Sequence, residues 1–216
     1  MNAGVKRRMI RFLGAACSRR TLSGLICWRG PRSVGKVAIT LDDGPRSRFT
    51  PAVLEILGAA QARATFFVEG QRARKHPDLV RRIVAAGHEI GNHGVAHEGP
   101  LRRQAAECRE ALKACGVPAR LFRPPLGRIG WREVVGLRWQ GYRTVLWSFD
   151  THDSMRFEGK WAGLPPDYSA VRAGDIVLMH DDNPVSVEEL PRLLAEVRRQ
   201  GLRTVTVSEL MRWGGR

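Results

Sequence analysis

The sequence ITLDDGPRS, residues 39 to 47, carries an apolar run into two adjacent aspartates, Asp42 and Asp43, and then into a turn. The run from Lys36 to Leu41 has the alternation and β-branched content of a strand, and Gly44-Pro45 is a turn signal. Paired carboxylates at the end of a strand predict a functional site at that edge of the sheet, provided that neighbouring strands also end in polar residues.

The segments after this strand alternate between strand-like and helix-like patterns, with short joints marked by Gly or Pro. This order predicts a single-domain α/β fold, a complete or incomplete (β/α) barrel of about seven βα units, rather than an open doubly wound sheet. The active site is then expected at the C-terminal ends of the strands. The predicted strands are Lys36–Leu41, Thr65–Val68, Glu89–Gly91, Leu121–Arg123, Arg143–Trp147, Asp175–Met179 and Arg203–Val207. The predicted helices are Pro51–Leu57 with Thr50 as N-cap, Pro77–Ala86, Leu101–Ala114, Arg132–Trp139 and Val187–Arg199.

The composition of the chain fits one soluble domain, since 216 residues are 43% hydrophobic and 26% charged. A formal charge of +15 would suit nucleic acid, an anionic membrane or an acidic polymer. Nucleic acid is disfavoured, because no zinc-finger spacing, helix-turn-helix signature or aromatic-interleaved basic strand is present. The four cysteines include no C-x-x-C pair, which is typical of apolar residues in a reducing compartment.

Residues 1 to 30 form a separate basic and amphipathic segment. Its apolar residues recur at helical spacing, while Arg11, Arg19 and Arg20 interrupt the apolar run that a signal peptide would need. Two interpretations stand: a helix in peripheral contact with a membrane, or a helix packed against the domain. No convincing cleavable signal is present and no segment is long enough to span a bilayer, so we expect a cytoplasmic protein, peripheral at the inner membrane face.

Polar clusters follow the predicted strands, and all of them would lie on one rim of the barrel. Each cluster alone has a structural explanation as a turn, a stiff loop or a satisfied surface histidine. Their shared position is what indicates a functional site. The clusters are DD at 42–43, NHGVAH at 92–97, RPPLG at 123–127, SFDTHD at 148–153 and HDD at 180–182.

A metal site is predicted within this set. His93 and His97 would project from one side of a helical turn with Cβ atoms about 5–6 Å apart. Asp43 would supply a carboxylate from the first strand end. Two imidazoles and one carboxylate, with positions left open for water and substrate, are the donors of a catalytic Zn²⁺ site, and Co²⁺, Ni²⁺ or Mn²⁺ would also bind.

These residues resemble the motifs of the polysaccharide deacetylases, the nodulation-type domain of carbohydrate esterase family 4. The resemblance runs from about Lys36 to Leu210 and predicts a catalytic domain over residues 36 to 212. Five motifs occur in the family's order. TLDDGP resembles T-F-D-D-G-P, HGVAH resembles H-[ST]-x-x-H, RPPLG resembles R-P-P-[YF]-G, DTHD resembles D-x-x-D-W, and LMH resembles L-x-H.

The resemblance implies a role for each matching residue in the hydrolysis of an N-acetyl group on an amino-sugar glycan or glycolipid. Asp43, His93 and His97 would hold the metal, and Asp42 would be the general base. Arg123 would keep Asp42 ionised and oriented. His180 would be the general acid, and Asp153 would orient it. A backbone N–H at Leu126 would stabilise the oxyanion, and Leu178 would contact the substrate.

Three positions depart from the family pattern. Gly94 stands where Ser or Thr is usual, Leu126 replaces an aromatic residue, and Ser154 replaces the Trp after Asp153. The catalytic set is complete, whereas the substrate wall is not standard, which favours an active enzyme with an unusual acceptor. O-acetyl ester hydrolysis and a weakly active or inactive carbohydrate-binding relative are the alternatives. The identity of the glycan, the metal and the oligomeric state are left open.

Overall fold

Nine short strands form one curled sheet in the computed structural model, which describes residues 25 to 212. The strand order is β1-β6-β5-β4-β3-β2-β8-β7, with β9 pairing with β2, and these pairings are parallel. Among the described residues no pairing joins β7 to β1, so the predicted barrel is incomplete. The strands are β1 (Ile26–Cys27), β2 (Lys36–Asp42), β3 (Ala64–Val68), β4 (Glu89–Asn92), β5 (Leu121–Phe122), β6 (Arg143–Val145), β7 (Phe149–Asp150), β8 (Ile176–His180) and β9 (Arg203–Thr204).

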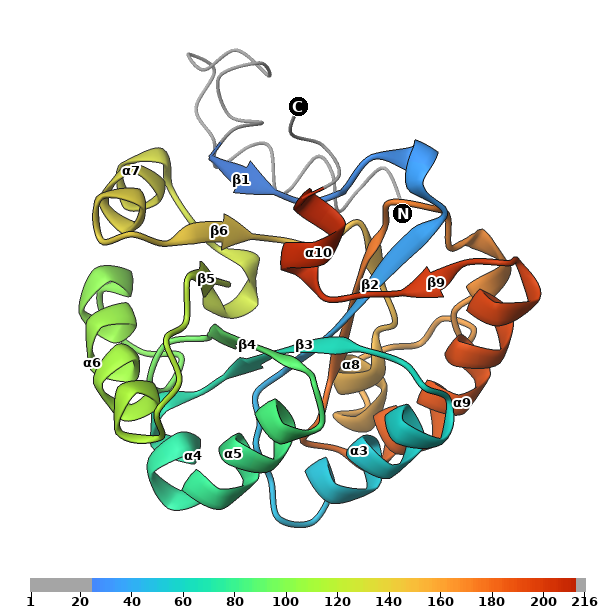
Figure 1. Cartoon of the computed structure of the whole chain (residues 1–216), viewed down its shortest axis with the longest axis horizontal. Helices are drawn as coiled ribbons and strands as arrows, with labels where there is room; N and C mark the ends of the chain where they lie inside the picture. Colours follow the sequence, from blue (N-terminus) through green and yellow to red (C-terminus); the bar gives the residue numbers. More distant parts are fainter. Residues whose placement is uncertain (1–24, 213–216) are drawn as a thin grey trace.

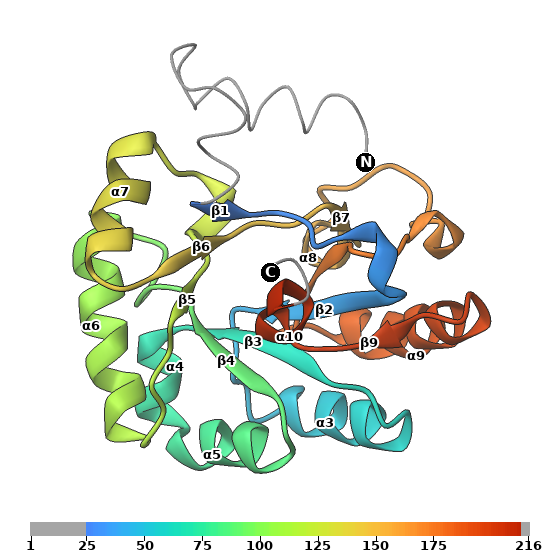
Figure 2. The ribbon, with the colours of Figure 1, turned by 45° about the horizontal axis from the view of Figure 1, so that its top comes forward.

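Most helices cover the outside of the curled sheet, as expected when parallel strands are joined by crossover connections, whereas α10 (Val207–Arg212) lies across the middle of the ring (Figure 1). The turned view in Figure 2 shows the same ring of helices around the strands. None of the helices within residues 25 to 212 combines the length and apolarity needed to cross a bilayer. The helices are α3 (Thr50–Ala59), α4 (Gly70–Lys75), α5 (Pro77–Ala85), α6 (Leu101–Ala114), α7 (Trp131–Trp139), α8 (Asp153–Phe157), α9 (Pro184–Arg199) and α10 (Val207–Arg212), with short 3₁₀ turns η1 (Arg32–Val34), η2 (Pro125–Gly127) and η3 (Tyr168–Ala170).

The alternation of side chains along β2 explains why Asp42 points into the barrel. Val37, Ile39 and Leu41 belong to the large apolar cluster that packs under the outer helices, and Ala38 belongs to the interior cluster. Because successive residues of a strand face opposite sides, Asp42 shares the interior side with Ala38 and Thr40. The last residue of this strand is thereby presented to the inside of the rim.

The predicted strand and helix regions are confirmed, with differences at their ends. Val207, predicted to end a strand, begins α10, because only Arg203–Thr204 pair with β2. Thr50 is not an N-cap: it is the first residue of α3, and its hydroxyl donates to Asp181 and accepts the N–H of Arg46.

Several short elements were not predicted. These are β1, β7, α4, α8 and α10, each of six residues or fewer. The helix proposed for the N-terminal segment does not extend to Ile26–Cys27, which pairs with β6 as a strand. The rest of that predicted helix lies outside the described residues. Cys27, Cys108 and Cys115 are buried free thiols, as expected of apolar cysteines.

Candidate active site

Asp42 and Asp43 are placed differently at the end of β2, although they are neighbours in sequence. Asp42 is the last strand residue and is 3% exposed. Asp43 has a φ of 69°, a left-handed conformation that turns the chain out of the strand. The strand alternation is therefore broken between the two residues, and both carboxylates border one cavity of about 280 Å³.

Asp43, His93 and His97 form a cluster with the geometry of a metal site. One donor atom from each residue lies within 4.8 Å of the other two. Asp43 Oδ1 is 2.9 Å from His97 Nε2 and 3.2 Å from His93 Nε2. The His93 Nδ1 atom lies 2.9 Å from the carbonyl oxygen of Arg123, so a proton on Nδ1 leaves the Nε2 lone pair facing the cluster. These residues fit a divalent cation.

The charges in this cluster reinforce one another. Burial acts to raise the pKa of Asp43, but hydrogen bonds to His93 and His97 outweigh it and hold that pKa well below its usual range. The hydrogen bond to Asp43 raises the pKa of His97. A metal ion has to displace the proton that Asp43 favours on His97, and the ionised carboxylate with two neutral imidazoles is then an anionic donor set that attracts a cation.

The loop that carries the two histidines is not helical, contrary to the prediction. The chain runs from β4 through Gly94, which has a φ of 82°, to His97, which has a φ of 39°. Gln104 of α6 holds this loop, since its Oε1 accepts the N–H groups of Val95 and Ala96 at 3.1 and 3.2 Å. A Cβ at Gly94 would lie 2.8 Å from that same oxygen. Glycine suits the left-handed φ at this position, and the Gln104 side-chain amide anchors the loop where Ser or Thr is usual.

Arg123 is fully buried behind Asp42. Its Nη1 donates to Asp42 Oδ1 at 2.8 Å and to the hydroxyl of Thr40 at 2.7 Å. The guanidinium lies 4.1 Å from the ring centroid of Phe67 and 5.7 Å from that of Trp147. Burial lowers the pKa of Arg123, and the Asp42 carboxylate opposes that effect. This cation fixes the orientation of Asp42 from within the barrel.

His180 lines the same cavity and is paired with Asp153. Asp42 of β2 and His180 of β8 are register partners, so the two strand ends lie at the same level. Asp153 Oδ1 is 2.9 Å from His180 Nδ1, and Asp153 Oδ2 accepts the backbone N–H of His180 at 2.8 Å. Burial acts to lower the pKa of His180, but the attraction and hydrogen bond of Asp153 raise it to about 10. The imidazole is therefore protonated at neutral pH.

The structure brings together all the site residues predicted from the sequence. Leu126 and Leu178 line the cavity with the metal cluster, Asp42 and His180, while Arg123 and Asp153 hold their partners from behind. Leu126 is 67% exposed, whereas Leu178 is 5% exposed. The cavity lining also includes residues without a predicted catalytic or metal-binding role: Pro124, Trp147, Asp150, His152, Ser154, Met155 and Glu158.

Glu69 is a further carboxylate at the cluster that sequence motifs did not indicate. It follows β3 and is 6% exposed, and its Oε1 lies 3.4 Å from His97 Nε2. Its other oxygen pairs with Arg72 at 3.3 Å. The signal available in the sequence was only its position directly after a buried strand, in FFVEG at 66–70.

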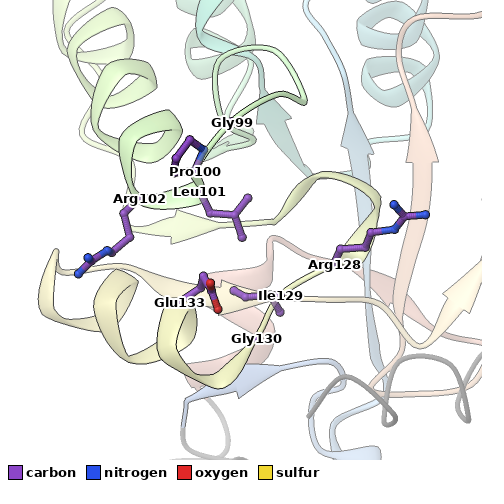
Figure 3. Close-up of a pocket in the computed structure, with 8 residues that line it drawn as sticks. All are labelled: Gly99, Pro100, Leu101, Arg102, Arg128, Ile129, Gly130 and Glu133. Carbon is purple, nitrogen blue, oxygen red and sulfur yellow. The ribbon is translucent and has the colours of Figure 1, made fainter. Parts of the chain in front are cut away.

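A larger hollow of about 470 Å³ lies beside two of the active-site loops (Figure 3). Gly99 follows the His97 loop and Arg128 follows the Leu126 turn, so the two hollows border the same loops. In Figure 3 the side chains of Arg102 and Arg128 extend away from each other. This hollow lacks histidine and has one carboxylate, Glu133. The smaller cavity is therefore the candidate active site.

Comparisons of this chain with known proteins point to one family. The sequence profile of the polysaccharide deacetylase family matches residues 29–145. The chain is 37% identical over 207 residues to a peptidoglycan-N-acetylglucosamine deacetylase of Bacillus cereus, with 88% of this chain and 95% of the relative covered. A chitooligosaccharide deacetylase of Sinorhizobium fredii is 36% identical over 173 residues, covering 76% and 79% of the two chains. A crystal structure of a peptidoglycan N-acetylglucosamine deacetylase has a TM-score of 0.79 at 27% identity, covering 91% of this chain and 98% of that one.

Proposed function

The chain belongs to the polysaccharide deacetylase family, and from this membership we propose that it hydrolyses the N-acetyl group of an N-acetylglucosamine-type residue in a glycan or glycolipid. Water and the acetamide give a free amine and acetate. The observation that carries the proposal is one cavity that brings together a metal-type Asp-His-His cluster, an aspartate held by Arg123 and a histidine held by Asp153.

Asp43, His93 and His97 would hold a divalent cation, with Zn²⁺ as the first choice because two imidazoles and one carboxylate suit it; Co²⁺, Ni²⁺ and Mn²⁺ also accept this donor set. When bound, such an ion polarises the acetamide carbonyl and the attacking water. The hydrogen bond between His93 and the Arg123 carbonyl supports this role, because it orients a ligand through its other ring nitrogen.

Asp42 is the general base in this proposal. It lies on the inner face of the strand end, and Arg123 holds its Oδ1, which leaves Oδ2 to accept a proton from the attacking water. The new C–O bond forms on the acetyl carbon, and the charge that develops on the carbonyl oxygen meets the backbone N–H of Leu126. Leu178 lines the cavity as a substrate contact.

His180 is the general acid. It is protonated at neutral pH, and Asp153 occupies its Nδ1, so Nε2 faces the cavity, 3.9 Å from Asp43 Oδ2. As the C–N bond breaks, His180 gives its proton to the leaving nitrogen, and the amine departs neutral. Asp42 then holds the proton taken from water, which balances the step.

The test is acetate release from a panel of N-acetylated oligosaccharides, peptidoglycan, surface polysaccharides and glycolipids, with and without a chelator. Release that stops with chelator and returns with added metal supports the proposal. The O-acetyl alternative predicts release from O-acetylated glycans only. A carbohydrate-binding relative without turnover predicts glycan binding with no acetate from any substrate.

A further inference from the structure

The part of the active-site cavity near Ser154 has no large side chain at position 154 that could contact a substrate. Ser154 borders the cavity at the position where the family motif has an aromatic residue. A hydroxymethyl group covers little surface, so another group has to form this wall if a sugar ring is to be held there.

His152 lies at the same wall. It immediately precedes α8 with a φ of 55°, a left-handed conformation, and its imidazole lines the cavity. Asp150 holds this conformation, because its Oδ1 accepts the backbone N–H of His152 at 2.8 Å and lies 3.3 Å from the ring Nδ1. The His152 side chain remains 20% exposed, so the ring is both fixed and accessible.

Trp161 supports the imidazole from a separate loop. The two ring centroids are 3.9 Å apart with an interplanar angle of 20°, which is a stacked arrangement. The indole is itself held, because its Nε1 donates to the carbonyl oxygen of Leu164 at 3.2 Å. One face of the imidazole is thus covered by an aromatic ring, so the imidazole beside Ser154 is a rigid planar surface with a polar edge.

We propose that His152, stacked on Trp161, is a specificity-determining residue that contacts the sugar ring bearing the acetamido group and takes the place of an aromatic side chain at position 154. A planar ring offers the apolar surface on which the C–H groups of a sugar pack, and an imidazole edge can exchange hydrogen bonds with hydroxyl groups. Asp150 and Glu158 at the same wall add acceptors for hydroxyls. Trp161 is a positioning residue, because it acts through His152. The inference rests on the proposed N-deacetylase function.

The test measures kcat and KM for acetate release from N-acetylated chitotetraose and from peptidoglycan. His152→Asn suits the left-handed backbone but removes the ring, so KM should rise about tenfold with kcat changed less than about threefold. Trp161→Ala should raise KM in the same direction, and Trp161→Phe should restore it. Trp139→Ala is the matched control, since Trp139 is 88% exposed on α7 and does not line the cavity.

Melting temperature and metal content are measured for each variant, so that a fold or metal defect is not read as a substrate effect. If His152→Asn does not fold, the comparison of Trp161→Ala with Trp161→Phe decides. An unchanged KM in the folded variants, or a fall in kcat alone, overturns the inference and leaves the deacetylase function standing. A wild-type protein that releases no acetate from either substrate overturns both.

Discussion

Asp42 and Asp43 carry the same functional group, but the end of β2 gives them different surroundings. Asp42 Oδ1 accepts from Arg123 at 2.8 Å, whereas Asp43 Oδ1 lies 2.9 and 3.2 Å from two imidazole nitrogens. Asp42→Asn should therefore keep the metal and lose turnover by about 10²-fold or more. Asp43→Asn should lose the metal itself.

Two measurements on both variants check this division of roles: the metal content by atomic spectroscopy, and the rate of acetate release. His97→Ala serves as the reference for a lost ligand, since it should lose metal and activity together. Equal metal loss in the two aspartate variants would show that the roles are not divided.

The pairing of His180 with Asp153 predicts a shift in the pH dependence. Asp153 raises the pKa of His180 to about 10 against the lowering effect of burial, so the acid form persists through neutral pH. In Asp153→Asn the raising charge is gone and burial remains. The alkaline limb of kcat/KM should then move to lower pH by more than about one unit.

The His180–Asp153 pair also determines how the free energy of unfolding changes with pH. Because the folded pKa of His180 exceeds the unfolded value of 6.5, its stabilising contribution is full below about pH 6.5 and is lost as pH rises through about 10. Urea midpoints of wild type and Asp153→Asn at pH 6 and pH 10 check this. Their difference should be larger at pH 6, and a larger difference at pH 10 would contradict the assignment.

Glu69 should affect metal affinity rather than chemistry. Its buried Oε1 lies 3.4 Å from His97 Nε2, and removing a charged group at this distance is expected to weaken divalent metal binding about tenfold. Calorimetric titration of metal-stripped Glu69→Gln with Zn²⁺ measures the effect. Glu55→Gln, on the exposed face of α3, is the matched control. Unchanged affinity in Glu69→Gln would make Glu69 a partner of Arg72 only.

The site residues that belong to the five sequence motifs were predictable, whereas single contacts between distant segments were not. Asp43, His93 and His97 follow strands that the sequence pattern already places on one rim. Glu69 was missed, since a carboxylate after a strand has no distinctive spacing. His152 lies in the DTHD motif on the predicted rim, but its place in the cavity wall depends on a left-handed backbone that no spacing indicates. The helical turn predicted for the two histidines was wrong because H-x-x-x-H spacing does not distinguish a helix from a glycine loop.

At the scale of elements, periodicity predicts the long helices and not the short ones. Helices of nine residues or more, such as α6 and α9, present two or more turns of apolar spacing. Elements such as α8, with five residues, and β7, with two, are too short to repeat any pattern. Their existence depends on tertiary contacts, as when Asp153 at the start of α8 pairs with His180.

The position of α8 depends on Glu189 of α9, which is 4% exposed. Its carboxylate accepts from the Tyr168 hydroxyl at 2.8 Å and lies 3.1 Å from Arg156 of α8. Glu189→Gln keeps the shape but weakens both contacts, so the free energy of unfolding should fall by about 1–3 kcal/mol. Urea unfolding measures this, and Glu188→Gln, the neighbouring glutamate of the same helix turn, is the control. Equal midpoints for the two variants would show that the Glu189 contacts do not stabilise the fold.

At the scale of the whole molecule, the parallel sheet is what makes one site out of distant residues. Asp42 pairs in register with Phe67 of β3 and with His180 of β8, and Asn92 of β4 pairs with Val68. Since these strands end at the same level, the polar residues that follow them meet on one rim. The alternating pattern predicted this arrangement. The pattern also allowed for an incomplete barrel, which the structure confirms, but the two-residue strands β1 and β7 that form its edges were not predictable from the sequence.

We propose that the basic N-terminal segment makes a peripheral membrane contact on the cytoplasmic side. Residues 1 to 24 carry Lys6, Arg7, Arg8, Arg11, Arg19 and Arg20, and each basic residue near an anionic leaflet contributes about 1 kcal/mol. Several such charges and a modest apolar stripe suffice for reversible binding. A membrane-proximal amino-sugar glycan or glycolipid would suit this location as substrate.

The structure sets where a deletion has to stop. Ile26–Cys27 pair with β6, so removing residues 1 to 30 would also remove an edge strand, whereas removing 1 to 24 leaves the sheet intact. The full chain should sediment with anionic vesicles at low salt and leave them at high salt, because exposed charges are screened within about 8–10 Å at 0.1–0.15 M. The shortened chain should stay in the supernatant and keep its melting temperature. If the full chain stays in the supernatant at low salt, the membrane contact is wrong, and if the shortened chain unfolds, the segment is a helix docked on the domain.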